Sequence, residues 1–500
     1  MVAMRAATIA LCLGLVIALL GATPCLRRSC DAAPAPPPQI RVVLGDAAAT
    51  QTVGGKLAWV LGGKVVARST EPVKVVLSDK AKQELTAEIG GRKLRVQRLR
   101  AEALEGYVRC GGSDYRGALE LFAGKEGGVV VLNVLPLEDY LLSVVPSEMP
   151  SAWPAEALRA QAVAARSYAL ARMAAQRDGT YDVFAGPASQ EYRGVGGEHE
   201  TSTQAVRDTA GQVLTYNGQP ITAYYCADAG GYTKAGEQPY LKAVPSFCPK
   251  SPHNDWSVPL SNEKLAALAK GEGHDVGQVL SVDAANDSHS GHLVSITIHG
   301  ERGACLIKAA HLRNLLGLSK MKSTRLHLES PGGASLLAAP AFCPAPDEPA
   351  PVRGLPRWLS VSLQGFSRPW VAWISGNAAL KMRTLYAFDG TKLVRCNRET
   401  AVVSGAANLP AAAEGAPPVA ASASALDGVV LRGSGYGHGL GMSQWGARQL
   451  AEEGKSYKEI LTYFYQGVEL VNWAGGAVQV PPQLKGEENN SFYVPFESGR

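Results

Sequence analysis

Residues 137–170, LEDYLLSVVPSEMPSAWPAEALRAQAVAARSYAL, carry the pattern that decides the fold of this chain. Residues 137–145 predict a short helix, and a proline-containing turn separates it from a second helix expected over 155–177. Pro154 suits the start of this second helix and Gly179 suits its end. The second helix holds ten alanines, and small side chains let a neighbouring backbone approach closely. We therefore expect it to be central and buried.

The turn between the two helices contains a single carboxyl group, that of Glu148. Its neighbours in sequence include Pro146, Met149, Pro150 and Trp153, and poor hydration among such residues predicts a raised pKa. A carboxylic acid that is still protonated near neutral pH can protonate the leaving oxygen of a glycosidic bond. Residue chemistry alone leaves an alternative open, in which Glu148 is a surface residue or an acidic charge at a helix N-terminus.

The composition describes an ordinary globular protein. Of the 500 residues, 46% are hydrophobic and 19% are charged, which suits two or three domains with sizeable cores. The net charge of +5 is too small to indicate nucleic-acid binding, and no basic run with interleaved aromatic residues is present. We therefore expect no nucleic-acid partner.

The N-terminus predicts export. Residues 1–30 combine Arg5 with an uncharged apolar run over 6–22, which fits a signal peptide or an uncleaved anchor, and both interpretations remain open. Residues 31–39 are rich in proline and predict an extended tether. The bulk of the chain should lie outside the cytoplasmic membrane, in the periplasm or cell envelope or secreted, with membrane contact only through the N-terminal segment.

The rest of the chain predicts an α+β fold. Residues 40–135 alternate β-branched runs with paired glycines and should form a β-rich N-terminal part. It should pack on a mixed α/β region over 136–330 whose C-terminal part is 428–475, and residues 476–500 form a tail. Pro, Ala and Gly flank a β-rich segment at 331–427, which is either an insertion into that region or a separate binding module.

Three local signals complete the prediction. Asn217-Gly218 between residues 212–216 and 221–225 predicts a β-hairpin. Six of the nine cysteines lie beyond the signal and the tether, and in an exported chain this even number is compatible with disulfides. Cys226 with Cys248 is the first pair to consider. The glycine-rich loop over 433–441 precedes a helix, but its spacing matches neither a dinucleotide fingerprint nor a P-loop.

Four motifs in this order make the chain resemble the stage II sporulation protein D and amidase-enhancer (SpoIID/LytB) family of bacterial cell-wall proteins. They are the opening stretch, TAGQVLTYNGQPITAYYCADAGGYT at 209–233, PYLKAV at 239–244, and GSGYGHGLGMSQWGARQLAEEGKSYKEILTYFY at 433–465. The resemblance covers most of 40–330 and about 428–470, and it leaves 331–427 unexplained. It implies that the mixed α/β region is the catalytic core of a peptidoglycan lytic transglycosylase. Such an enzyme cuts the bond between N-acetylmuramic acid and N-acetylglucosamine, in the sporulation branch on strands stripped of stem peptides.

The resemblance also implies roles for particular residues. Glu148 matches the family's catalytic glutamate, and Arg166 matches the arginine of the following helix. The resemblance implies that Arg166 orients Glu148 or binds the lactyl carboxylate of the sugar. Tyr240 and Lys242 match its Y-L-[K/R] motif, although an ordinary strand with one exposed face would explain this pair equally well. One carboxyl group suffices for lytic transglycosylation, because the acid that protonates the leaving oxygen then accepts the proton of the muramic C6 hydroxyl group.

Other positions of the motifs carry weaker implications. Gln190 and Tyr192 match a Q-x-Y motif that implies glycan contact. Some relatives hold zinc near this motif through cysteine and histidine, but residues 181–192 contain neither, so we expect no metal and no other cofactor. His438 either lines the cleft or supports the glycine loop by hydrogen bonding, and we favour the second role.

Two classes of function compete. The first is an enzyme that acts on the glycan strands of peptidoglycan. The second is a non-catalytic module that binds glycan and enhances a cell-wall amidase, which would then be its partner. A secreted metallo-hydrolase is a weak third interpretation, because the nine histidines are scattered and no H-E-x-x-H motif is present.

Overall fold

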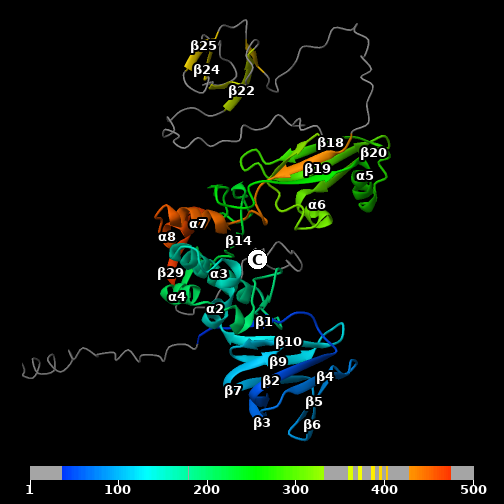
Figure 1. Ribbon diagram of the computed structural model, residues 1–500, viewed down its shortest axis with the longest axis vertical. Coiled ribbons are helices and arrows are strands. Elements are labelled where there is room, and N and C mark those ends of the chain that lie inside the picture. Colours follow the sequence, from blue (N-terminus) through cyan, green and yellow to red (C-terminus); the bar gives the residue numbers. More distant parts are fainter. Residues whose placement is uncertain are drawn as a thin grey trace, which may run out of the picture. The chain divides into compact units, whose positions relative to one another are not determined.

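The computed structural model describes residues 37–177, 179–330 and 427–473, together with the backbone of five strands between residues 358 and 403 (Figure 1). By its internal contacts the chain divides into two units. One unit is Ala339–Ser424, and the other joins Met1–Ala338 to Ala425–Arg500. The predicted signal or anchor and the predicted tail lie outside the described residues.

The N-terminal part of the larger unit is an 11-stranded sheet, as the paired glycines and β-branched runs predict. Its main strand order is β11-β1-β10-β9-β7-β2-β4-β5-β6, with β3 on β2 and β8 on β7. The neighbours are antiparallel except that β11 is parallel to β1. The strands are β1 (Gln39–Val43), β2 (Thr50–Leu61), β3 (Lys64–Ser69), β4 (Val73–Asp79), β5 (Glu84–Ile89), β6 (Arg92–Val96), β7 (Arg98–Cys110), β8 (Ser113–Tyr115), β9 (Ala118–Ala123), β10 (Val129–Pro136) and β11 (Val183–Phe184).

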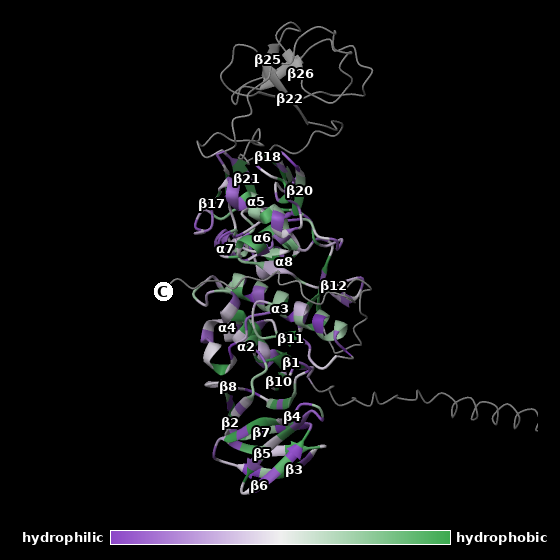
Figure 2. Ribbon diagram, turned by 90° about the vertical axis from the view of Figure 1, so that its right-hand side faces the viewer, coloured by the Kyte–Doolittle hydropathy of each residue, from purple (hydrophilic) through white to green (hydrophobic). Residues whose placement is uncertain are grey.

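Hydrophobic side chains hold this sheet together. Hydrophobic and hydrophilic residues both occur along β2, β5 and β7, which is typical of antiparallel strands with one face on a core (Figure 2). Trp59, Leu85 and Leu119 are fully buried in that core. Tight turns at positive φ join the strands, as at Gly62 and Gly63 with φ of 53° and 78°.

The opening stretch forms two helices, α2 (Leu137–Glu148) and α3 (Ala155–Ala175). Helix α2 is longer than the sequence predicts, because it continues past Pro146. Pro146 lacks the N–H group that would bond to a carbonyl group one turn earlier, and the helix ends two residues beyond it. Glu148 is therefore the last residue of a helix and not part of the following turn.

Helix α3 is central, as its alanines predict. Fourteen of its 21 residues are buried, and it packs against four helices and against β12 (Gln212–Tyr216). Those helices are α2, α4 (Glu200–Asp208), α7 (Gln444–Glu452) and α8 (Tyr457–Phe464). Residues from the far end of the chain thus complete the core that begins with α2.

The predicted hairpin is shorter than expected. Strand β12 pairs with β13 (Gln219–Pro220) across Asn217-Gly218, but the chain then leaves the ladder. Strand β14 (Tyr225–Cys226) instead runs parallel to β28 (Met442–Ser443), and β29 (Glu469–Asn472) covers the other edge of β12. Pairing with the C-terminal segment replaces the longer hairpin.

A second hydrophobic cluster is formed by residues 256–328 together with Val429 and Leu431. It joins two three-stranded sheets, β17-β27-β21 and β18-β19-β20, with two helices. The elements are β17 (Trp256–Leu260), α5 (Asn262–Gly271), β18 (Val279–Asn286), β19 (Leu293–Gly300), β20 (Gly303–Lys308), α6 (Ala309–Leu316), β21 (Leu326–Glu329) and β27 (Val429–Gly433). A two-stranded ribbon, β15 (Gly231–Tyr232) with β16 (Pro245–Ser246), precedes them. The fold class is therefore α+β, as predicted.

The smaller unit contains a five-stranded antiparallel sheet in the order β25-β24-β23-β22-β26. Its strands are β22 (Trp358–Leu363), β23 (Trp370–Trp373), β24 (Leu385–Phe388), β25 (Leu393–Cys396) and β26 (Ala401–Val403). The alternating apolar residues between 358 and 403 thus form strands.

The predicted Cys226–Cys248 disulfide is absent. Cys110, Cys226, Cys248 and Cys305 are all buried free thiols. Cys226 lies in β14, whereas the Cys248 thiol donates a hydrogen bond of 3.6 Å to Gln449 Oε1. Within the described ranges, no helix is both long and apolar enough to cross a membrane.

Candidate active site

Glu148 is fully buried at the C-terminal end of α2. One carboxyl oxygen, Oε1, accepts a hydrogen bond of 2.8 Å from the backbone N–H of Glu191. The other, Oε2, is buried without a hydrogen-bond partner among the described residues. The alternatives of a surface residue and of an acidic charge at a helix N-terminus are therefore both excluded for Glu148.

This environment raises the pKa of Glu148 well above its usual value. Burial is the largest cause, and the negative charge of Glu191 acts in the same direction. The Glu191 N–H group and the polar side chains of Tyr225 and Gln444 favour the charged form, but they do not outweigh burial. The partial negative charge at the end of α2 also disfavours a carboxylate there. The site thus holds a carboxyl group that keeps its proton above the pH at which an exposed glutamate loses it.

Residues 189–193, called the strap below, lie over this carboxyl group, and Gln190 anchors them. Its side chain is fully buried. The Gln190 Nε2 group donates to Tyr225 Oη at 2.8 Å, and its Oε1 accepts from Tyr140 Oη at 3.2 Å. Gln190 therefore joins α2, the strap and β14. Its contact with glycan stays a prediction.

Tyr192 is the second anchor of the strap. It is 7% exposed, and its hydroxyl group donates a hydrogen bond of 2.6 Å to Asn133 Oδ1 in β10. Its ring packs against those of Tyr115 and Tyr140, with centroids 6.1 and 5.1 Å apart. The N-terminal sheet thereby positions the strap that touches Glu148. The contact of Tyr192 with glycan stays a prediction.

The site also contains two glutamines that were not predicted from the sequence. Gln161 of α3 and Gln444 of α7 are buried, and Gln444 Nε2 lies 3.5 Å from Gln161 Oε1. The Gln161 Nε2 group is buried without a hydrogen-bond partner among the described residues. Gln161 could have been predicted as a site residue, because it is a polar residue in an alanine-rich helix that is expected to be buried. Nothing in the sequence brings Gln444 to it across 283 positions.

Arg166 does not lie at this carboxyl group. Its guanidinium is buried and binds Glu138 through two hydrogen bonds of 2.7 and 2.8 Å. It also donates to the carbonyl oxygen of Gln212 at 3.1 Å. Glu138 is ten residues before Glu148 in the same helix, which corresponds to about 15 Å along the axis. Arg166 thus joins α2, α3 and β12, and a substrate could reach its buried donors only by breaking those bonds. Its part in orienting Glu148 or binding substrate stays a prediction.

The structure separates the roles of Tyr240 and Lys242. Tyr240 is 5% exposed, its hydroxyl oxygen accepts from the Thr222 N–H group at 3.2 Å, and burial raises its pKa to about 12. Lys242 is exposed, and its carbonyl oxygen accepts from Thr233 Oγ1 at 3.1 Å. Only Lys242 of this pair presents its side chain to solvent, where a ligand could meet it.

His438 contacts the backbone of the glycine loop, which is the arrangement that the favoured prediction describes. Its Nδ1 accepts a hydrogen bond of 2.9 Å from the Leu440 N–H group, and burial lowers its pKa to about 3, so the ring is neutral. The loop approaches other backbone closely. Gly441 has a φ of 68°, and a Cβ atom there would lie 1.9 Å from the Tyr224 carbonyl oxygen. The glycines of this motif serve close packing and not anion binding.

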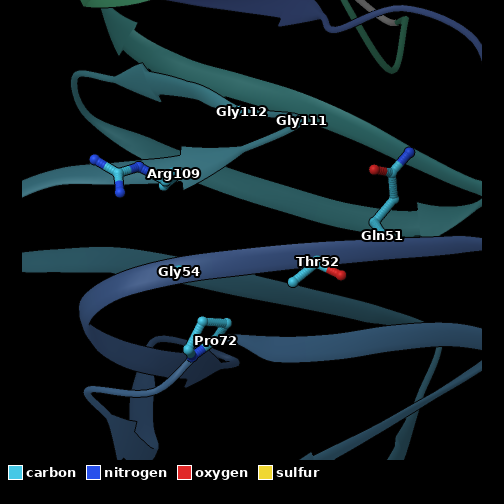
Figure 3. Close-up of a pocket in the computed structure, with 7 residues that line it drawn as sticks. All are labelled: Gln51, Thr52, Gly54, Pro72, Arg109, Gly111 and Gly112. Carbon is cyan, nitrogen blue, oxygen red and sulfur yellow. The ribbon is translucent and has the colours of Figure 1, made fainter.

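A surface hollow elsewhere does not belong to this site. It lies in the N-terminal sheet, where β2 and β7 approach Pro72 (Figure 3). Its lining residues are Gln51, Thr52, Gly54, Pro72, Arg109, Gly111 and Gly112. Arg109 is engaged there by Asp114 through bonds of 2.7 and 3.0 Å. None of the residues that line the hollow carries a carboxyl group.

The site offers no place for a metal ion among the described residues. No group of three or more histidine, cysteine, aspartate or glutamate side chains is arranged there to hold one.

Comparison with known proteins agrees with the motifs. Residues 125–216, which contain α2, α3 and Glu148, match the family model described as stage II sporulation protein (SpoIID). The chain is 27% identical over 345 residues to the amidase enhancer of Bacillus subtilis (strain 168), which covers 67% of this chain and 40% of that protein. It is 26% identical over 363 residues to stage II sporulation protein D of Bacillus amyloliquefaciens, covering 67% of this chain and 74% of that protein. The match to stage II sporulation protein D of Bacillus subtilis (strain 168) is 24% identical over 352 residues.

The proteins that this chain resembles are related to the bacterial cell wall. Within that class, the chain is a relative of the SpoIID/LytB family, as its four motifs predict. The chain spans less than half the length of the amidase enhancer that it matches.

Proposed function

We propose that this protein cleaves the bond between N-acetylmuramic acid and N-acetylglucosamine in peptidoglycan by lytic transglycosylation. The observation that carries the proposal is the buried carboxyl group of Glu148, whose raised pKa keeps it protonated where a glycosidic oxygen needs an acid. Glu148 is also the residue that matches the family's catalytic position. Similarity to the sporulation branch favours strands already stripped of stem peptides, and an exported, envelope-associated protein.

Glu148 would act twice in this reaction. Its Oε2 has no competing partner among the described residues, so its proton can pass to the glycosidic oxygen as the bond from that oxygen to C1 breaks. The resulting carboxylate then accepts the proton of the muramic C6 hydroxyl group, and the C6 oxygen forms the new bond to C1. The products are a 1,6-anhydromuramic end and a free hydroxyl group on the leaving sugar. No water is consumed, and Glu148 ends protonated.

Substrate access requires movement around Glu148, because its side chain is fully covered. The covering groups include Glu191 of the strap and Gln444 of α7. The strap is held mainly through Gln190 and Tyr192. A glycan that displaces these side chains would meet the Glu148 Oε2 and Gln161 Nε2 atoms directly, and neither atom has a partner in the described part of the chain.

The remaining candidate residues take different roles in this proposal. Lys242, exposed on the PYLKAV segment, is suited to bind the lactyl carboxylate of muramic acid. Arg166, Gln190, Tyr192 and His438 act as positioning residues, since their polar groups are engaged within the protein.

A second candidate is a non-catalytic protein that binds glycan and enhances a cell-wall amidase. Full burial of Glu148 favours it, because an unreactive relative has no need to expose this carboxyl group. The similarity to a protein named amidase enhancer favours it as well.

The test is a digest of purified peptidoglycan, with and without stem peptides, by the exported part of the chain from residue 31 onward. Mass spectrometry of the products separates the candidates. Ends lighter by one water than hydrolysis products support lytic transglycosylation, and Glu148→Gln should abolish them. Hydrated reducing ends would indicate a hydrolase. Binding without cleavage, together with faster wall digestion when an N-acetylmuramoyl-L-alanine amidase is added, would favour the enhancer.

A further inference from the structure

Gln161 carries a buried hydrogen-bond donor that the described part of the chain does not use. The residue lies in α3 and is fully buried. Its Nε2 group has no hydrogen-bond partner among the described residues. An unpaired buried donor destabilises the folded state, so each one in a protein calls for an explanation, such as a role in catalysis or in binding another molecule.

Two sets of contacts place this donor in the same site as Glu148. On one side, Gln161 Oε1 lies 3.5 Å from Gln444 Nε2, and the Gln444 side chain also lies against the Glu148 carboxyl group. On the other side, the strap that binds Glu148 Oε1 is held to α3 through Gln190, whose Nε2 lies 3.4 Å from the Ala165 carbonyl oxygen. Ala165 is one turn after Gln161, which corresponds to about 6 Å along the helix axis. Gln161 and Glu148 therefore belong to one site.

The contact with Gln444 also decides which end of the Gln161 amide is unpaired. A donor needs an acceptor opposite it, so the Gln444 Nε2 group faces the carbonyl oxygen of Gln161 and leaves its Nε2 group as the free end. Glu148 Oε2 is likewise without a partner among the described residues. A ligand that enters this site thus meets two donors, the Gln161 amide and the protonated Glu148 carboxyl group.

The reacting sugar carries two acceptors on neighbouring carbon atoms. In the bond that the proposed reaction cleaves, C1 of muramic acid bears the glycosidic oxygen, and C2 bears an acetamido group with a carbonyl oxygen. Glu148 donates to the first acceptor in the proposed reaction. The acetamido carbonyl oxygen is the natural partner of an uncharged amide N–H group, whereas the lactyl carboxylate on C3 pairs better with a cation.

We propose that Gln161 recognises the 2-acetamido group of the muramic sugar by donating a hydrogen bond from Nε2 to its carbonyl oxygen. The inference rests on the proposed function and names the feature of the substrate that this part of the site selects. The glycan then supplies the acceptor that Gln161 lacks, and C1 is held next to the Glu148 carboxyl group. Gln444 is a positioning residue, because it holds the Gln161 amide by its oxygen. No covalent bond forms or breaks at either glutamine.

The first test measures cleavage by Gln161→Met, which replaces the amide by an uncharged side chain of similar length. The substrates are fully acetylated strands, strands deacetylated at the muramic residues, and strands deacetylated at the glucosamine residues, which carry the same added amino charge as a control. Deacetylation at muramic acid should lower kcat/KM of the wild type by about threefold to tenfold, the range for one uncharged hydrogen bond. In Gln161→Met this preference should disappear, because kcat/KM on acetylated strands falls by the same factor.

The preference is a ratio measured on one preparation, so partial misfolding of the variant does not change it. Gln204→Met is the matched control, because Gln204 is an exposed glutamine of α4 whose Nε2 donates to Asp208 Oδ1 at 2.6 Å. It should keep the wild-type preference. A preference for acetylated muramic residues that survives in Gln161→Met would overturn the proposal. Loss of a preference for acetylated glucosamine instead would place the contact on the other sugar and would overturn it as well.

The second test measures binding without cleavage. Calorimetric titration with soluble acetylated and muramic-deacetylated strands compares Glu148→Gln with the double variant that adds Gln161→Met, which should bind acetylated strands about threefold to tenfold more weakly. A protein that forms no anhydro ends but shows this difference would refute the proposed function and keep the recognition. A protein that forms anhydro ends and shows no difference would refute the recognition alone, and one that binds no glycan would refute both.

Discussion

Glu148→Gln should make the protein more stable and inactive at the same time. Glutamine has nearly the same shape, and its side-chain oxygen can still accept the Glu191 N–H group that now binds Glu148 at 2.8 Å. It removes a carboxyl group whose charged form is disfavoured by full burial. It also removes the proton that the proposed reaction needs, and loss of a general acid costs about 10²–10⁴-fold in rate.

The direction of the stability change follows from proton linkage. The pKa of Glu148 is higher in the folded chain than in the unfolded chain, so the folded state binds more protons between these two values. Its contribution to the free energy of unfolding therefore decreases as pH rises from the unfolded pKa to the folded pKa, and it stays low above. The loss amounts to about 1.4 kcal/mol for each pH unit by which the two pKa values differ. Glu148→Gln removes this loss, so its advantage over the wild type should be absent in acid and grow with pH.

Urea unfolding of both proteins from acid to neutral pH measures this difference, and peptidoglycan digestion measures the activity. Glu138→Gln is the matched control, because Glu138 lies in the same helix but forms an ion pair with the buried Arg166. That substitution leaves the guanidinium without its carboxylate and should lower the free energy of unfolding by roughly 2–3 kcal/mol, less than for a fully buried pair because Glu138 is 38% exposed. Parallel stability curves for wild type and Glu148→Gln would refute the argument from burial.

Three further changes test how the site is supported. Arg166→Lys keeps the charge but not the two-pronged ion pair, so it should lower stability by about 2 kcal/mol in thermal unfolding and leave KM unchanged, whereas a substrate-binding arginine would raise KM. Tyr192→Phe leaves a buried acceptor unpaired; calorimetry should show a loss of about 1–3 kcal/mol, and cleavage should slow because the strap loosens. Gly441→Ala brings Cβ to 1.9 Å from the Tyr224 carbonyl oxygen, and it should cost clearly more in a thermal melt than Gly218→Ala, which also has positive φ but no atom within 4 Å. Equal costs for the two glycine changes would contradict the close-packing argument.

Local signals in the sequence predict much of the fold. The paired glycines and β-branched runs predict the N-terminal strands, and Pro154 with the alanine-rich run predicts α3 within two residues of its observed end. Such features depend on near neighbours in the chain, which is why they can be recognised without a structure. The extension of α2 to Glu148 and the early end of β13 were missed, because the first depends on packing around a proline and the second on pairing with a strand more than 200 residues away.

The candidate site was predictable only in part. The sequence points to Glu148, and apolar neighbours correctly predict the direction of its pKa. It also points to Arg166, but helix geometry sends that side chain toward Glu138 and not toward Glu148. In the Q-x-Y motif the two matched residues are anchors, whereas the unmatched Glu191 between them touches the candidate acid.

The sequence by itself therefore determined the α+β class, the central alanine-rich helix, the family resemblance and the position of the candidate acid. Only the tertiary structure decided which groups surround that acid and which of its atoms have hydrogen-bond partners. It brought Gln444 and Glu191 to Glu148, left Glu148 Oε2 without a partner among the described residues, and engaged Arg166 elsewhere. The physical reason is that propensity and turn chemistry act over a few residues, whereas burial and charge at Glu148 are sums over segments that meet only in the folded chain.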